Sequence, residues 1–226
     1  MSRQARQKSQ SGIYHVILRG INKQVIFEDD EDRQKYMECL QYYKNICQYS
    51  IYGYCLMDNH IHLLIREGKE TLGHTMKRIG VSYVAWYNRK YNRCGHLFQD
   101  RFKSEVVESD GYLLTVLRYI HQNPLEGGEV KNLAAYKWSS YREYMGERKI
   151  VDTDFVTGIF AQEQEQALTS FEKFMNEKRD DSCLEIDEPK RLTDREAKII
   201  IQKYADVRMP AAMQKMEKVK RDEILR

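Results

Sequence analysis

Two histidines one residue apart, His60 and His62, stand in a segment with the composition of a β-strand, His60-Ile-His-Leu-Leu-Ile65. Side chains alternate between the faces of a strand, so both imidazoles point one way while the apolar residues point the other. Neutral imidazole nitrogens bind several divalent metals, and two histidines leave room for water and a phosphate oxygen. The pair predicts a metal site, although a hydrogen-bonded structural role explains such a pair more often when it is taken alone.

A second pair of candidates, Tyr119 and Asn123, is four residues apart in a segment of helical pattern. This spacing places both side chains on one helix face. An amide oxygen can be a hard metal ligand, and a phenol oxygen is a nucleophile once it has lost its proton. A free tyrosine has a pKa of about 10, so a nearby cation must favour the charged form and polarise a phosphate. Periodicity alone favours the alternative that Tyr119 packs on a sheet.

The elements that must position these residues follow from hydrophobic spacing and turn signals. Strands are predicted over residues 12–19, 50–57, 60–65 and 102–108, and helices over residues 30–48, 71–92 and about 112–123. Ser109 or Asp110 is the expected cap of the third helix, which should end near Asn123 because Pro124 disfavours helical geometry before it. The order matches an α+β, ferredoxin-like (RRM-like) antiparallel sheet with helices on one face and an added helix.

Beyond Tyr144 the composition changes, and no strand pattern remains. We predict a helical C-terminal region, with an acidic linker near residues 178–189. A capping box at Thr193-Asp-Arg-Glu196 predicts one further helix that continues through Tyr204.

Charge and composition exclude several classes of protein. The net charge is +3, and residues 71–118 hold eight basic and four acidic side chains, a local excess that suits a polyphosphate partner or a solvated helix face. No apolar run reaches the roughly 20 residues of a membrane-spanning helix, and the basic residues 1–11 resemble no signal peptide. Five cysteines without a CxxC pair argue against a zinc knuckle and a disulfide framework. A reduced protein of the cytoplasm, nucleoid-associated and without a membrane partner, is expected.

Five segments of the chain, in order, are similar to motifs of one known family. They are His15-Val-Ile-Leu-Arg-Gly-Ile-Asn22, Tyr54-Cys-Leu-Met-Asp-Asn-His-Ile-His-Leu-Leu64, Gly95-His-Leu-Phe-Gln-Asp-Arg-Phe-Lys-Ser104, Tyr119-Ile-His-Gln-Asn-Pro124 and Trp138-Ser-Ser-Tyr141. Together they resemble the single-tyrosine HUH transposases, in particular the REP-associated tyrosine transposase branch. The resemblance implies a catalytic domain over residues 12–145, between a basic tail of residues 1–11 and the helical region of residues 146–226.

The same resemblance implies the chemistry. His60 and His62 match the family's metal ligands, Tyr119 matches its nucleophile, and Asn123 stands where relatives place a polar side chain, often Gln, that completes the metal site. The implied ion is Mg²⁺ or Mn²⁺, and the implied partner is single-stranded DNA with a hairpin or palindromic repeat. A monomer and a homodimer both remain open.

The resemblance also ranks the remaining candidates. Arg19, Arg101 and Lys103 lie inside family motifs and are predicted to contact DNA phosphates, with surface salt bridges as the alternative. Tyr112 competes with Tyr119 for the role of nucleophile, but it stands seven residues earlier. Four other histidines are interpreted as structural or DNA-contacting: His15, His74, His96 and His121.

Two rival functions remain compatible with the sequence. The first is a non-catalytic, RRM-like nucleic-acid-binding protein, in which the sheet face stacks bases and the histidines are polar contacts. The second is a metal-dependent hydrolase that uses activated water in place of tyrosine.

Overall fold

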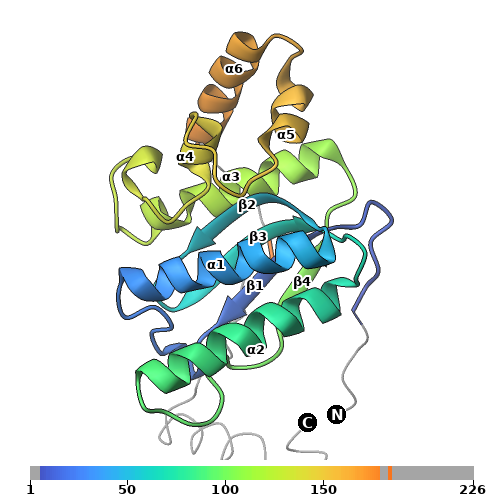
Figure 1. Cartoon of the computed structure of the whole chain (residues 1–226). Coiled ribbons are helices and arrows are strands. Elements are labelled where there is room, and N and C mark those ends of the chain that lie inside the picture. Colours follow the sequence, from blue (N-terminus) through green and yellow to red (C-terminus); the bar gives the residue numbers. More distant parts are fainter. Residues whose placement is uncertain (1–5, 179–182, 185–226) are drawn as a thin grey trace, which may run out of the picture. The chain divides into compact units, whose positions relative to one another are not determined.

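The computed structural model of the chain describes residues 6–178 and 183–184. Its centre is a four-stranded antiparallel sheet in the order β2-β3-β1-β4 (Figure 1). The strands are β1 (Ile13–Arg19), β2 (Ser50–Leu56), β3 (His60–Arg66) and β4 (Lys103–Val106). This order is the ferredoxin-like arrangement, so the predicted α+β fold is confirmed.

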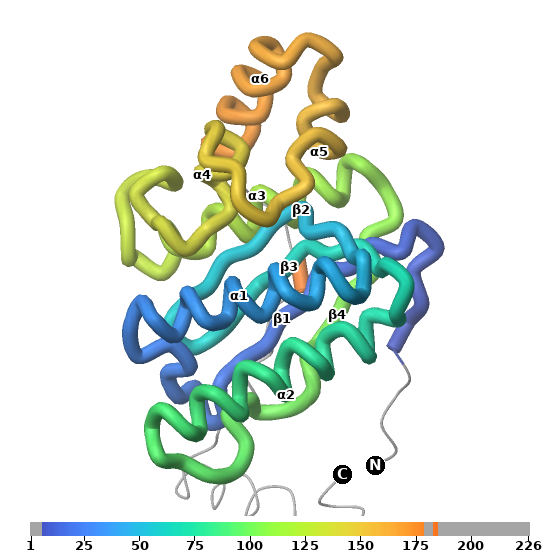
Figure 2. The backbone as a smooth tube through the Cα atoms, in the orientation of Figure 1, coloured from blue at the N-terminus to red at the C-terminus, as the bar shows by residue number. Residues whose placement is uncertain are grey.

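Helices cover both faces of the sheet. Helix α1 (Asp30–Cys47) and helix α2 (Leu72–Lys90) lie side by side on one face (Figures 1 and 2). Helix α3 (Asp110–Glu126) packs against β2 and β3 from the other face. The first two helices are those of the ferredoxin-like unit, and α3 is the added helix that the sequence predicts.

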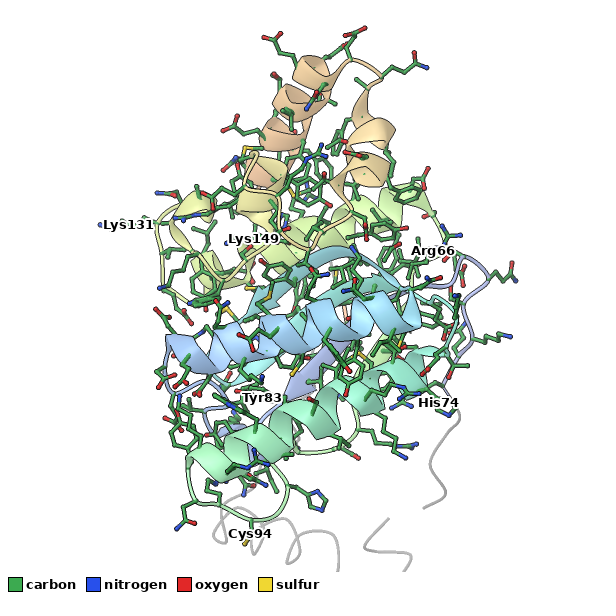
Figure 3. All side chains as sticks on the ribbon, in the orientation of Figure 1. Arg66, His74, Tyr83, Cys94, Lys131 and Lys149 are labelled. Carbon is green, nitrogen blue, oxygen red and sulfur yellow. The ribbon has the colours of Figure 1, made fainter. Side chains whose placement is uncertain are left out.

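Alternation along β3 divides the interior into two cores. Ile61, Leu63 and Ile65 pack under α1 and α2, whereas Leu64 packs under α3. In the first core Tyr83 lies between the two covering helices (Figure 3). Its ring meets that of Tyr36 edge-on. Because one face of β3 is fully apolar, its register is set by burial, and the histidines are confined to the α3 face.

The helix that carries Tyr119 begins where predicted but continues further. The Ser109 hydroxyl accepts a hydrogen bond from the Tyr112 N–H and caps α3. The expected end near Asn123 is wrong, because Pro124 is inside the helix, which continues to Glu126. Pro124 lacks an N–H, so the helix loses one backbone hydrogen bond here, and the buried ring packs in the interior. Asn123 thereby remains helical, one turn after Tyr119.

Two smaller boundaries also differ from the sequence expectation. Strand β4 is shorter than residues 102–108: it ends at Val106, three residues before Ser109 caps α3. Short 3-10 turns, η1 (Ile21–Lys23) and η2 (Leu133–Ala135), occupy segments for which no element was predicted.

Three helices follow residue 140, and the last of them packs against α3. They are α4 (Tyr141–Tyr144), α5 (Thr153–Phe160) and α6 (Gln164–Asn176). They share the second core with α3. Of the three, α5 and α6 lie in the predicted helical region of residues 146–226, so helical structure is confirmed for this part of it. The predicted capping box at residues 193–196 lies outside the described residues, as does most of the predicted linker. None of the described helices is long and apolar enough to cross a membrane.

Helix α3 is tied to α6 through one buried amide. The Gln122 Nε2 donates hydrogen bonds of 2.8 Å to the carbonyl oxygens of both Met175 and Glu177, which stand at the C-terminal end of α6. Carbonyls at a helix end have no partner within the helix, so this side chain satisfies the carbonyl of the buried Met175 and that of the exposed Glu177.

We predict that Gln122→Met lowers the free energy of unfolding by about 1–3 kcal/mol, because two carbonyls lose their donor while side-chain volume is nearly conserved. Urea unfolding monitored by circular dichroism measures the change. Gln41→Met, on the exposed side of α1, is the matched control and should shift stability by less than about 0.5 kcal/mol. Equal stability of the two variants would contradict the role of Gln122.

Candidate active site

The two predicted histidines lie on the face of β3 that α3 covers. His62 is buried, with 2% of its surface exposed, and His60 at the start of the strand is half-buried. Their rings meet edge-on with centroids 5.0 Å apart. The sequence therefore correctly predicts that both imidazoles project to one face, and the structure adds that α3 covers this face at β3.

Each imidazole has its Nδ1 engaged by a neighbour. The Nδ1 of His60 is 2.7 Å from the Oδ1 of Asn59, and the Nδ1 of His62 is 3.1 Å from the Nε2 of His15. Hydrogen bonds at one ring nitrogen determine which nitrogen can serve as a metal ligand. In both residues this leaves Nε2 as the candidate ligand atom.

Helix α3 delivers the other two predicted residues to the same place. The Oδ1 of Asn123 is 3.5 Å from the Nε2 of His60, while its Nδ2 donates a 3.0 Å hydrogen bond to the carbonyl of Tyr119. The Tyr119 ring is buried and meets the His62 ring edge-on, with centroids 5.4 Å apart. All four candidates, drawn from β3 and α3, thus form one cluster.

The donor set of this cluster suits a divalent ion. Neighbouring ligands of an octahedral Mg²⁺ at about 2.1 Å stand about 3 Å apart, and the 3.5 Å separation of His60 Nε2 from Asn123 Oδ1 is close to that value. Among the described residues, no group of three or more His, Cys, Asp and Glu side chains is arranged to hold a metal. An imidazole pair completed by an amide oxygen is the set that β3 and α3 offer here.

Burial sets the electrostatics of the histidines. It lowers the pKa of His60 below the usual value; the contact with Asn123 raises this pKa in part, and the charge of Arg19 lowers it further. Burial likewise lowers the pKa of His15. These effects favour neutral imidazoles, which is the state that can bind a metal.

The three predicted DNA-contacting residues occupy different places. Arg19 ends β1 directly opposite His60, and its charge acts on that ring. Lys103 is exposed at the start of β4, where it pairs with Ile17, which in turn pairs with His62. Arg101 is exposed in the loop before β4 and belongs to no part of the cluster. The structure therefore brings Arg19 to the site and leaves Arg101 outside it.

One member of the site was missed by sequence reasoning. His15 has no partner at ligand spacing in the sequence, yet it is fully buried against His62, and its ring also meets that of Tyr119 with centroids 5.7 Å apart. Beyond it, the Oε2 of Glu105 is 3.9 Å from the His15 Nδ1. The available signal was alternation along β1, which puts His15 on one face with Ile17, but only strand pairing reveals which face that is.

The other histidines and the competing tyrosine lie elsewhere. His121 is buried, and its Nε2 is 2.7 Å from the Ser140 hydroxyl, so it has the structural role that was one of its two interpretations. His74 and His96 are exposed. Tyr112 is in the first turn of α3, where its hydroxyl contacts Glu105. All five cysteines are free, as the sequence predicts.

Comparison with known proteins identifies a family whose matched span includes all four candidate residues. The family described as “Transposase IS200 like” matches residues 8–123, a span that starts before β1 and ends at Asn123. A solved structure of a REP-associated tyrosine transposase bound to a REP hairpin matches with a TM-score of 0.56 and 16% identity, covering 65% of this chain and 87% of that one. At this identity the likeness shows the fold. No curated protein matches the chain.

Proposed function

This chain belongs to the IS200-like transposase family, and on that premise we propose that it cleaves and rejoins single-stranded DNA through a covalent bond to Tyr119. The family implies DNA transposition, and the matched span contains every residue that the proposal uses. The observation that carries it is the convergence of Tyr119 and Asn123 from α3 on the two histidines of β3.

A divalent metal ion, Mg²⁺ or Mn²⁺, is proposed to be held by His60, His62 and Asn123. Mixed nitrogen and hard oxygen ligands suit either ion when the substrate is a phosphate. Once bound, the ion would polarise the scissile phosphate and favour the charged form of a nearby phenol. Asn59 holds the His60 ring by its Nδ1, so Nε2 is kept on the side of Asn123.

Tyr119 is proposed to act as the nucleophile. Its phenol oxygen loses a proton to solvent and attacks the phosphorus, forming a tyrosine O–P bond as the bond from phosphorus to the 3′ oxygen breaks; the released 3′ oxygen takes up a proton from solvent. The products are a 5′-phosphotyrosine and a strand that ends in a 3′-hydroxyl. A 3′-hydroxyl attacks the phosphotyrosine in the reverse reaction, which rejoins strands without ATP because the phosphodiester energy is kept in the covalent bond.

The proposed substrate is a single strand that contains a hairpin. A solved structure with this fold holds a REP hairpin, and the basic residues Arg19 and Lys103 lie on the histidine-bearing face of the sheet. Phosphate contacts of this kind position a nucleic acid without reading its sequence. Arg101, outside the cluster, would contact DNA away from the cleaved bond.

We predict that Tyr119→Phe reduces the protein–DNA adduct below detection and changes hairpin affinity by less than about twofold, because only the nucleophilic oxygen is removed. Labelled hairpin oligonucleotides with Mn²⁺, resolved on denaturing gels, report the adduct, and fluorescence anisotropy reports binding. Tyr112→Phe makes the same chemical change on the same helix and should retain the adduct.

The rival functions give different results in this assay. Cleavage of the oligonucleotide by Tyr119→Phe without an adduct would favour the hydrolase. Binding by the wild-type protein with neither cleavage nor adduct at any metal concentration would favour the RRM-like binder.

We further predict that cleavage disappears with EDTA and returns with Mg²⁺ or Mn²⁺. In His60→Ala, adduct formation should fall at least about 100-fold, because one of three ligands is lost. Isothermal titration with Mn²⁺ should show weaker binding in this variant. His96→Ala, an exposed site, is the control, and identical Mn²⁺ binding by both variants would remove His60 from the metal site.

Substitutions of Arg19 and Arg101 should differ in their effects on the cleavage rate and on hairpin affinity. Arg101→Ala is expected to weaken hairpin binding and to flatten the log–log salt dependence by about 0.7 per lost phosphate contact, without slowing cleavage at saturating DNA. Arg19→Ala should also slow cleavage at saturating DNA by about tenfold or more, because its charge is beside His60. Equal cleavage rates in the two variants would contradict this distinction.

A further inference from the structure

Behind His62, on the side away from His60, lies a second buried imidazole that the proposed reaction does not use. His15 on β1 is fully buried, and its Nε2 is 3.1 Å from the His62 Nδ1. The two rings are nearly parallel, with an angle of 21° between their planes. In the sheet, His62 pairs with Ile17, so His15 is one pleat further along β1 on the same face.

The second nitrogen of His15 points to a carboxylate on the next strand. Glu105 of β4 is the cross-strand partner of His15, and its Oε2 is 3.9 Å from the His15 Nδ1. This separation exceeds a hydrogen bond and leaves a charge–dipole contact. No hydrogen-bond partner of this buried Nδ1 is present in the described part of the chain, so Glu105 is the group available to it.

Glu105 is itself held in place from its other side. Its Oε2 accepts a 3.1 Å hydrogen bond from the backbone N–H of Leu184, and the Tyr112 hydroxyl also contacts its carboxyl group. The contact with His15 is the largest effect that keeps the pKa of Glu105 below its usual value. Across the sheet the Glu105 carboxylate on β4, the His15 imidazole on β1 and the His62 imidazole on β3 therefore form a series.

We propose that His15 and Glu105 are positioning residues that fix the tautomer and orientation of His62, so that its Nε2 carries the lone pair offered to the metal. The inference rests on the proposed function, because it assumes that His62 is a metal ligand. The direction follows from the carboxylate. It attracts the proton of His15 to Nδ1, which leaves Nε2 of His15 as an acceptor and requires His62 to donate from its Nδ1.

A hydrogen bond in the opposite direction, from His15 to His62, would prevent metal binding. If His15 donated to His62, the remaining proton of a neutral His62 would stand on Nε2 and block coordination. A carboxylate behind a metal-binding histidine is a known way to fix its tautomer and raise its basicity, and losing such a partner costs about 10- to 100-fold in metal affinity. Here a second histidine transmits the effect.

Two measurements on the full chain test this inference. Long-range ¹H–¹⁵N NMR of the metal-free protein identifies the tautomer of His62, which should be Nδ1–H in the wild type. Mn²⁺ titration followed by the EPR signal of the free ion should show about 10- to 100-fold weaker binding in His15→Phe, which keeps an aromatic ring against Tyr119 but removes the acceptor.

Conservative variants distinguish positioning from packing. In His15→Gln the amide oxygen can accept from His62, so most of the Mn²⁺ affinity should return. His74→Phe, at an exposed position on α2 labelled in Figure 3, is the control and should bind like the wild type. If His15→Phe does not fold, Glu105→Leu interrupts the same series at a half-buried residue, with Glu105→Gln as its control.

The outcomes separate this inference from the proposed function. An Nε2–H tautomer in the wild type, or wild-type Mn²⁺ affinity in folded His15→Phe or in Glu105→Leu, overturns the positioning role. Absence of Mn²⁺ binding that depends on His60 overturns the metal site of the proposed function instead, and the NMR tautomer still decides the arrangement of His15 and His62.

Discussion

The close packing of α3 on strands β2 and β3 is the contact on which the site depends. It is allowed by Gly53 of β2, where a Cβ atom would stand well inside van der Waals contact of the Leu117 side chain. Leu117 is fully buried, so it has little room to move. A larger residue at position 53 would therefore displace the Leu117 side chain, which packs α3 against β2 one turn or less from Tyr119.

This packing places a polar cluster inside an apolar layer, and each buried polar group then needs a partner. Among the site residues, hydrogen bonds link His62 to His15, His60 to Asn59, and the Asn123 amide to the Tyr119 carbonyl, while the Asn123 Oδ1 faces the His60 Nε2 at 3.5 Å. This network has few alternative arrangements, because losing the contact between His15 and His62 would leave two buried imidazole nitrogens unsatisfied. The cluster is preorganised for the same reason that it is costly to disturb.

Neighbouring residues of α3 make contacts on two different sides of the helix. Tyr119 and Asn123 face the sheet, whereas Gln122 binds the end of α6 and His121 binds Ser140. Ser140 in turn accepts a hydrogen bond from the Tyr54 N–H on the edge of β2. The Tyr-Ile-His-Gln-Asn-Pro and Trp-Ser-Ser-Tyr motifs therefore fit together as one structure: the second anchors β2 and α3, and the first presents the candidate chemistry.

Much of this arrangement was predictable from the sequence because it depends on local periodicity. Alternation in β3 determines that His60 and His62 share a face, and helical spacing determines that Tyr119 and Asn123 do. The end of α3 was not predictable, since Pro124 is accommodated by burial at the end of the helix rather than by local preference. Strand pairing likewise has no local signal. Because β1 lies between β3 and β4, His15 contacts both His62 and Glu105. The same pairing places Arg19, but not Arg101, beside the site. The sequence by itself thus determined which side chains share a face of each element, and only the tertiary structure decided which faces meet, because register between distant segments follows from burial of the whole sheet.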